Sequence, residues 1–273
     1  MNRIAAASAA LLASTAVAQA DISRTDQSMR LMFENVGPSG NYAELSFGSV
    51  RPKAGATGIE NPLLGYQLPG FGFLHRYSDS LSVGLIYDTP YGAAVRYAPA
   101  PGIFNGGGAN VETDALTLIG RYSFNENVSA HVGVRALRGE GTINTFFAND
   151  GAVIPLGVAP AFPANLTASS DTGYGYLIGA AYEVPEIALR VALTYHSPIS
   201  LSFAATEQSI AAPASRPFEL EFPESYNLEF QSGVAADTLV FGSVRYQMWD
   251  GFNLTVPNSV VIGQTNARYV NFS

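Results

Sequence analysis

The sequence predicts an all-β protein, a transmembrane antiparallel β-barrel, on three grounds: composition, residue alternation and the lengths of the connections. Only 13% of the 273 residues are charged, about half the share that is usual in soluble domains. No stretch after residue 20 reaches the roughly 18 consecutive apolar residues that a spanning helix needs. Glycine, phenylalanine and tyrosine are frequent instead. Barrels have this profile because apolar and polar residues alternate along each strand.

The same composition excludes several other classes. Cysteine is absent, which excludes a disulfide scaffold and a thiolate metal site. The formal net charge is −8, and an acidic chain argues against nucleic acid as a partner. Residues 1–20 are expected to be a cleaved signal peptide, with Arg3, an apolar run and the small-x-small sequence Ala18-Gln19-Ala20. This signal predicts export to the outer membrane of a Gram-negative cell.

Strict alternation then predicts strands along the rest of the chain. We expect them near residues 42–51, 69–77, 81–88, 113–124, 128–139, 172–184, 187–197, 219–232 and 237–248. In the clearest hairpin, one face carries Leu116, Leu118, Tyr122, Val132 and Val134. Its other face carries Thr117, Arg121, Ser129, His131 and Arg135. The apolar faces are expected to point outward to lipid.

The connections alternate between short and long, as in outer-membrane barrels. Short turns are expected at residues 78–80, 125–127, 185–186 and 233–237, and long links at 51–67, 88–111 and 141–170. Tyrosine and phenylalanine gather at strand ends, where two lipid–water interfaces would lie. A soluble β-sandwich also has one apolar face per strand, but it would not need outward aromatic residues at both ends.

Several spaced segments resemble FadL-type outer-membrane transporters of long-chain fatty acids and other hydrophobic compounds. They are residues 40–48 (GNYAELSFG), 86–92 (IYDTPYG), 121–127 (RYSFNEN) and 171–176 (DTGYGY). The resemblance implies a monomeric fourteen-stranded barrel with an N-terminal hatch in its lumen. It also implies that apolar ligand is captured between extracellular loops and released sideways into the bilayer.

The chain departs from that family pattern in two ways. Residues 21–40 precede the first strand without the family's Asn-Pro-Ala motif, so we expect a reduced hatch or plug, with the apolar run Leu31-Met32-Phe33. Residues 41–273 would form the barrel, with about ten to eleven strands. The chain stops at Ser273 without a clear closing strand. We therefore expect a barrel that is incomplete at the C-terminus or that closes as a smaller one.

Candidate substrate-binding residues form two sets. In the lumen we expect Arg121, Arg135, Arg190, Arg245 and His131, with Arg76 and His196 also inward and Glu44 and Glu229 opposing them. Guanidinium groups bind carboxylates in a fork geometry, although the same arginines could brace the barrel. In the loops we expect an apolar capture site of Tyr91, Tyr97, Phe104, Phe146, Phe147 and Phe162, although these residues could instead pack together as a cap.

Catalysis finds little support in the sequence. The chain has no Gly-x-Ser-x-Gly or His-Glu-x-x-His motif, and the adjacent His196 and Ser197 are expected on opposite faces of a strand. We expect no cofactor and no metal. The predicted function is transport of hydrophobic compounds, most of all long-chain fatty acids, with outer-membrane lipids around the barrel. A general porin and an aromatic-hydrocarbon channel stay open as alternatives, and a lipid-acting enzyme is less favoured.

Overall fold

The computed structural model describes residues 22–25, 27–36, 40–54, 60–98, 107–147, 162–208, 214–235, 237–248, 255–256 and 267–268. The expected signal peptide and Phe104 lie outside these residues. None of the helices in this part of the chain has the length and apolar character needed to cross a bilayer.

Twelve strands form one antiparallel sheet. They are β1 (Asn41–Val50), β2 (Tyr66–Arg76), β3 (Leu81–Asp88), β4 (Gly92–Arg96), β5 (Gly108–Ser123), β6 (Val128–Phe147), β7 (Phe162–Val184), β8 (Leu189–His196), β9 (Ile199–Gln208), β10 (Ala214–Phe222), β11 (Ser225–Ala235) and β12 (Thr238–Gln247). Two 3-10 helices, η1 (Arg30–Phe33) and η2 (Pro185–Ile187), and a separate pair, β13 (Thr255–Val256) and β14 (Ala267–Arg268), complete the described elements.

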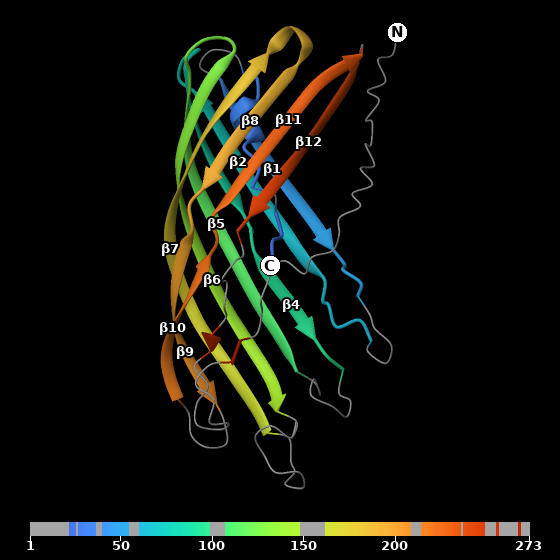
Figure 1. Ribbon diagram of the computed structural model, residues 1–273, viewed down its shortest axis with the longest axis vertical. Coiled ribbons are helices and arrows are strands. Elements are labelled where there is room, and N and C mark those ends of the chain that lie inside the picture. Colours follow the sequence, from blue (N-terminus) through green and yellow to red (C-terminus); the bar gives the residue numbers. More distant parts are fainter. Residues whose placement is uncertain are drawn as a thin grey trace.

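The sheet is curled into a half-barrel (Figure 1). Its short turns lie at one end, at the top of Figure 1, and its long connections lie at the other. We call these the short-turn end and the long-loop end. Strand order runs from β1 to β12, and no pairing joins those two edge strands within the described residues. The edge strand β12 has no second neighbour, and most of its residues are exposed on both faces among the described residues.

Three long strands are each interrupted near a proline. β3 and β4 both pair with β5, and β8 and β9 both pair with β7. In the same way, β10 pairs with β9 and β11 pairs with β8. The breaks fall at Thr89-Pro90, Ser197-Pro198 and Pro223-Glu224. Proline cannot donate to the ladder of hydrogen bonds and is therefore confined to edges and irregular points of sheets.

In the middle of the wall, the alternating apolar and polar residues face outward and inward, as expected. Leu118, Val132 and Leu228 face outward and are 49%, 59% and 40% exposed. Arg121, His131 and Arg190 face inward and are buried. On β7 the outward apolar residues extend from Tyr174 to Tyr182, a span that matches the roughly 9–11 residues of a transmembrane strand. Exposed tyrosines at both ends of that span suit the two lipid–water interfaces.

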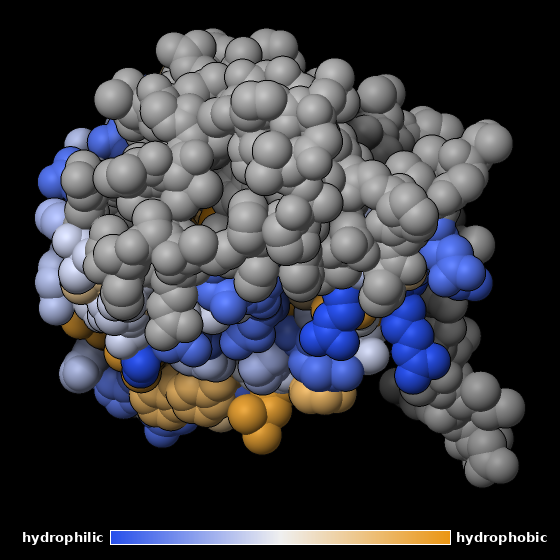
Figure 2. Space-filling view, turned by 90° about the horizontal axis from the view of Figure 1, so that it is seen from below, coloured by the Kyte–Doolittle hydropathy of each residue, from blue (hydrophilic) through white to orange (hydrophobic). Residues whose placement is uncertain are grey.

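Toward the long-loop end the polarity of the wall is reversed. On β9 and β10 the apolar residues Leu201, Phe203 and Phe222 face inward and are buried. Ser200 and Glu221, which join side chains across the pair at 3.2 Å, are exposed. Seen from this end, hydrophilic side chains gather around the described part of the rim (Figure 2). This part of the wall therefore stands outside the apolar band.

Residues 22–25 and 27–36, which we call the N-terminal segment, lie against the inner face of the curled sheet. Met29, Leu31 and Met32 are buried in one cluster with inward residues of β2, β5 and β7: Leu74, Ile119 and Leu177. Two glycines make room for them. A Cβ at Gly84 would lie 2.4 Å from the Met32 sulfur, and one at Gly72 would lie 3.1 Å from the Leu31 methyl groups.

Each of the nine predicted strand ranges overlaps a strand of the sheet, but the expected long link at 141–170 was wrong. β6 continues to Phe147 and β7 begins at Phe162, with Phe147 paired to Phe162. A shift of register between Gly139 and Gly141 interrupts the alternation there, which hid the extension. The single range 219–232 was also wrong, because it joins parts of β10 and β11 across Pro223. β4 lies in the expected link at 88–111, and β9 was not predicted at all.

Candidate functional site

Near the short-turn end, two inward arginines pack against one aromatic ring of the N-terminal segment, that of Phe33. The Arg121 and Arg190 guanidinium carbons lie 4.4 and 4.5 Å from the centre of the Phe33 ring. Arg121 also donates to the Met32 carbonyl at 3.1 Å and pairs with Glu183. His131 approaches the same ring edge-on at 6.4 Å. Because a desolvated cation over an aromatic ring is attractive, this contact fixes the segment to the wall.

A carboxylate on β11 holds the turn before η1. Glu229 accepts a hydrogen bond from the Ser28 hydroxyl and another from the Met29 backbone N–H at 2.9 Å. Hydrogen bonds to an ionised acceptor are stronger than neutral ones. Glu229 is buried, and these donors offset the cost of removing its charge from water.

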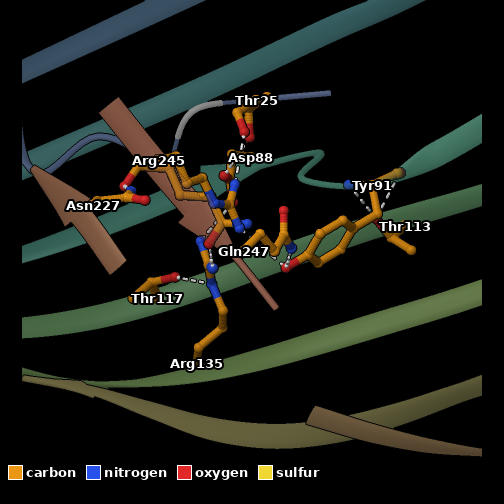
Figure 3. Close-up of polar contacts among 10 residues, drawn as sticks. Thr25, Asp88, Tyr91, Thr113, Thr117, Arg135, Asn227, Arg245 and Gln247 are labelled. Carbon is orange, nitrogen blue, oxygen red and sulfur yellow. Dashed lines mark hydrogen bonds and ion pairs between the residues drawn. The ribbon is translucent and has the colours of Figure 1, made fainter. Parts of the chain in front are cut away.

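A second polar network crosses the middle of the lumen (Figure 3). Arg135 on β6 donates to Thr117 at 3.0 Å, to Gln27, and to Asp88 at 3.4 Å. Asp88 also accepts from the Thr25 hydroxyl at 2.9 Å. Strands β3, β5 and β6 are thus joined to Thr25 and Gln27 by one buried cation and one carboxylate.

β12, the edge strand of the sheet, contacts the same network through Tyr91. Arg245 donates to the Thr25 carbonyl at 3.1 Å and to the Tyr91 hydroxyl at 3.2 Å. Gln247 donates to that hydroxyl at 3.1 Å and accepts from Ser23 at 2.8 Å. These contacts connect β12 to the β3–β4 break across the concave side of the half-barrel, although the two do not pair as strands.

An apolar cluster adjoins Tyr91 on the side of the long-loop end. The Tyr91 ring stacks on Phe222 at 4.5 Å, and buried residues of five strands complete the cluster: Ala115, Leu137, Ala168, Ile199, Leu201, Phe203 and Leu220. The inner wall therefore changes from apolar near the long loops to polar at Arg135 and Arg245.

The wall itself contains an opening between β2 and β4. β2 pairs with β3 only from Phe71 onward. β4 is linked to residues 62–64 instead: the Leu64 N–H donates to the Ala94 carbonyl at 2.9 Å, and the Arg96 N–H donates to the Pro62 carbonyl at 2.7 Å. Between these two connections lies a cavity of about 650 Å³. Its lining includes Arg24, Tyr66, Pro69, Ala94, Glu112 and Asp114. We call this cavity the wall gap; its volume falls within the roughly 300–1,000 Å³ of small-molecule sites.

The family model described as outer membrane protein transport protein (OMPP1/FadL/TodX) matches residues 1–266. The chain belongs to this family. A long-chain fatty acid transport protein of Salmonella typhi is 27% identical over 203 residues, which are 70% of this chain and 45% of that protein. The chain thus spans about half the length of this curated relative.

The fold agrees with that membership in the OMPP1/FadL/TodX family. The crystal structure of the Pseudomonas putida toluene transporter TodX superposes with a TM-score of 0.54 at 13% identity, over 85% of this chain and 70% of that one. The OMPP1/FadL/TodX proteins are outer-membrane transport proteins and not enzymes. Within the described residues, no group of three or more His, Asp or Glu is arranged to hold a metal ion.

The expected luminal residues lie inside the half-barrel of this OMPP1/FadL/TodX member. Arg121, Arg135, Arg190 and His131 are buried and Arg245 is half-buried. Arg121, Arg135 and Arg245 already donate to the N-terminal segment, so a substrate carboxylate would have to replace those acceptors. Their role as substrate ligands stays a prediction.

The expected loop residues are dispersed. Tyr91 lies in the break between β3 and β4, where its backbone bridges to Ser23 and its side chain is only 5% exposed; its role in capturing substrate stays a prediction. Tyr97 follows β4 and donates its N–H to Gly107 at 2.8 Å. Phe146, Phe147 and Phe162 belong to the ends of β6 and β7, and Phe104 lies outside the described residues.

Some polar residues of the site were missed by the sequence reasoning. Asp88, Glu183 and Gln27 all contact luminal arginines, and Asp88 was placed at the start of a loop. The signal was present, because Asp88 stands at a strand end one residue before Thr89-Pro90. The expectation that His196 and Ser197 face apart was also wrong: both line one small cavity, since the strand ends there. Ser197 is nevertheless bonded to the Tyr176 N–H at 2.9 Å.

Proposed function

We propose that this protein carries hydrophobic compounds, most of all long-chain fatty acids, across the outer membrane and releases them sideways through the wall gap. The observation that carries the proposal is the interruption of the barrel wall at Thr89-Pro90, which leaves a 650 Å³ cavity between β2 and β4. The fatty acid transport protein of Salmonella typhi supports the choice of substrate.

Substrate enters from the long-loop end, where the inner wall is apolar. Burying an acyl chain is favourable by roughly 0.8 kcal/mol per CH₂, so the cluster around Phe203 and Phe222 suits the chain. Tyr97, Phe104, Phe146, Phe147 and Phe162 assist the first capture. Arg121, Arg135, Arg190, Arg245 and His131 meet the headgroup once the N-terminal segment moves.

A general aqueous porin is less well supported. Residues 22–25 and 27–36 occupy the concave side of the sheet and bond to β5, β6, β11 and β12. In the proposed function this segment is the reduced hatch, and water-filled passage along the barrel axis is closed. Residues 1–20 direct export and are removed.

Filling the wall gap tests the proposal. Ala94 lines the cavity, whereas Ala180 lies on the exposed outer face of β7. Ala94→Phe and Ala180→Phe add the same side-chain volume at these two places. We expect Ala94→Phe to reduce uptake of radiolabelled oleate several-fold in cells that lack their own transporter, while Ala180→Phe leaves uptake unchanged. Equal uptake by both variants, at equal amounts in the outer membrane, would exclude release through the gap.

A further inference from the structure

Arg24 is the one arginine of the N-terminal segment whose side chain reaches the wall gap. Its backbone is pinned to the β3–β4 break, because its N–H donates to Pro90 at 2.7 Å and the next ladder bond runs from Gly92 to Ile22 at 2.8 Å. A Cβ at Gly92 would lie 2.3 Å from the Arg24 guanidinium carbon. The missing side chain at Gly92 is therefore what lets Arg24 extend through the break into the cavity.

The guanidinium lacks an acceptor in the described chain. Its carbon lies 4.2 Å from the centre of the Tyr66 ring, which covers one face but accepts no conventional hydrogen bond. Its Nε is buried without a hydrogen-bond partner, and no ion pair to Arg24 occurs among the described residues. Burial lowers the pKa of Arg24, and Tyr66 and Glu112 oppose that shift. The side chain as a whole is half-buried, and its one buried donor without an acceptor, Nε, is costly.

The acidic neighbours are engaged elsewhere. Glu112 accepts a hydrogen bond from the Asn110 amide at 2.9 Å, and Asp114 accepts one from the Tyr87 hydroxyl at 2.6 Å. Both line the cavity but leave the fork of Arg24 open. A carboxylate at that fork would receive two parallel hydrogen bonds, while Leu64, Pro69 and Val95 offer apolar surface for a chain.

We propose that Arg24 binds the carboxylate of an acidic amphiphile in the wall gap and makes this exit selective for fatty acids over neutral hydrophobic compounds. The inference rests on the proposed function, since it assigns the substrate class of the same gap. Binding at Arg24 would distinguish a fatty acid from an aromatic hydrocarbon, because the hydrocarbon has no anionic group for the guanidinium.

Paired ligands of equal chain length test the assignment. Equilibrium binding of radiolabelled palmitate and 1-hexadecanol is measured with the full chain in detergent micelles. Because a hydrogen bond to a charged group is worth about 1.5–3 kcal/mol, Arg24→Gln should weaken palmitate binding about tenfold or more. Hexadecanol binding should not change. Arg30→Gln is the matched control, because Arg30 is exposed in the same N-terminal segment, pairs with Glu34 and Glu44 and is not part of the cavity lining.

A second variant separates carboxylate binding from a merely structural role of Arg24. A competing lipid separates the binding of a fatty acid from the binding of lipid headgroups. Arg24→Lys keeps the charge and should retain part of the preference for palmitate; if it loses palmitate and hexadecanol equally, Arg24 is only structural and the assignment fails. Phosphatidylglycerol should not displace palmitate, and displacement at matched concentration would assign the site to lipid headgroups instead. Unchanged palmitate binding by Arg24→Gln would also overturn the inference, while the Ala94→Phe result would still decide the exit route independently.

Discussion

At the scale of single residues, the lumen is organised by arginines that hold the N-terminal segment. Arg121 and Arg190 enclose Phe33. Arg135 donates to Gln27, and Arg245 donates to the Thr25 carbonyl. Each contact joins a strand to a segment far away in sequence. Arg121, Arg135 and Arg245 thus have acceptors in the N-terminal segment, whereas no acceptor of the Arg24 side chain occurs among the described residues.

Phe33 should control how firmly the segment is held. Phe33→Leu keeps an apolar side chain but removes the ring between two cations, a contact worth about 0.5–2 kcal/mol per pair. We expect more frequent openings in planar-bilayer conductance recordings, whereas Phe33→Tyr should behave as the parent protein does. Phe71→Leu, on the outer face of β2, is the control for loss of a ring. If Phe33→Leu and Phe71→Leu behave alike, the two arginines do not hold the segment.

Glu112 should oppose the binding of acids in the wall gap. Its carboxylate lines the cavity and is an electrostatic neighbour of Arg24, so it repels a bound carboxylate. We expect Glu112→Gln to raise the affinity for palmitate a few-fold and to leave that for hexadecanol unchanged. Glu186→Gln, exposed in η2 at the short-turn end, removes an equal charge as control. A fall in palmitate affinity would contradict this placement of the acid.

At the scale of elements, the N-terminal segment and the broken β3–β4 strand form one unit. Ser23 bridges to Tyr91, and Arg24 and Gly92 extend the same ladder. Any displacement of the segment must break these bonds at the edge of the wall gap. Opening of the lumen and opening of the gap are therefore expected to be coupled.

Removal of the segment should open an aqueous path. Deleting residues 21–38 leaves β1 intact and takes away the chain that fills the concave side. We expect faster swelling of proteoliposomes in small sugars than with the complete chain, with equal protein incorporation verified by tryptophan fluorescence. Unchanged swelling rates would mean that these residues do not act as a plug.

The middle of the wall was predictable from the sequence, and the long-loop half was not. Leu118 and Arg121 on β5 were assigned to the correct faces because lipid and lumen impose opposite polarities there. On β9 the exposed residues are small and mostly polar, and the inward ones are apolar, so the rule for the lipid-facing band does not apply. The contacts of Arg24 and Asp88 depend on the break at Pro90, and spacing along the chain does not reveal such a contact.

At the scale of the whole molecule, an outward apolar band surrounds a lumen that is apolar near the long loops and charged in the middle. The exposed tyrosines Tyr174 and Tyr182 mark the two ends of the band on β7. The wall gap lies at the break of β3 and β4, beside the segment that fills the lumen. In the proposed function, this arrangement is the path of a hydrophobic compound from the long-loop end to the bilayer without passage through water.

Chemical capture of a substrate in the gap tests this central claim most directly. The chain has no cysteine, so Ala94→Cys and Ala180→Cys each introduce the only thiol. A long-chain fatty acid with a thiol-reactive group at its methyl end is added to outer membranes that contain each variant. We expect Ala94→Cys to be modified faster than Ala180→Cys, and excess oleate to protect only Ala94→Cys. Equal rates of modification without protection by oleate would contradict passage of the substrate through the wall gap.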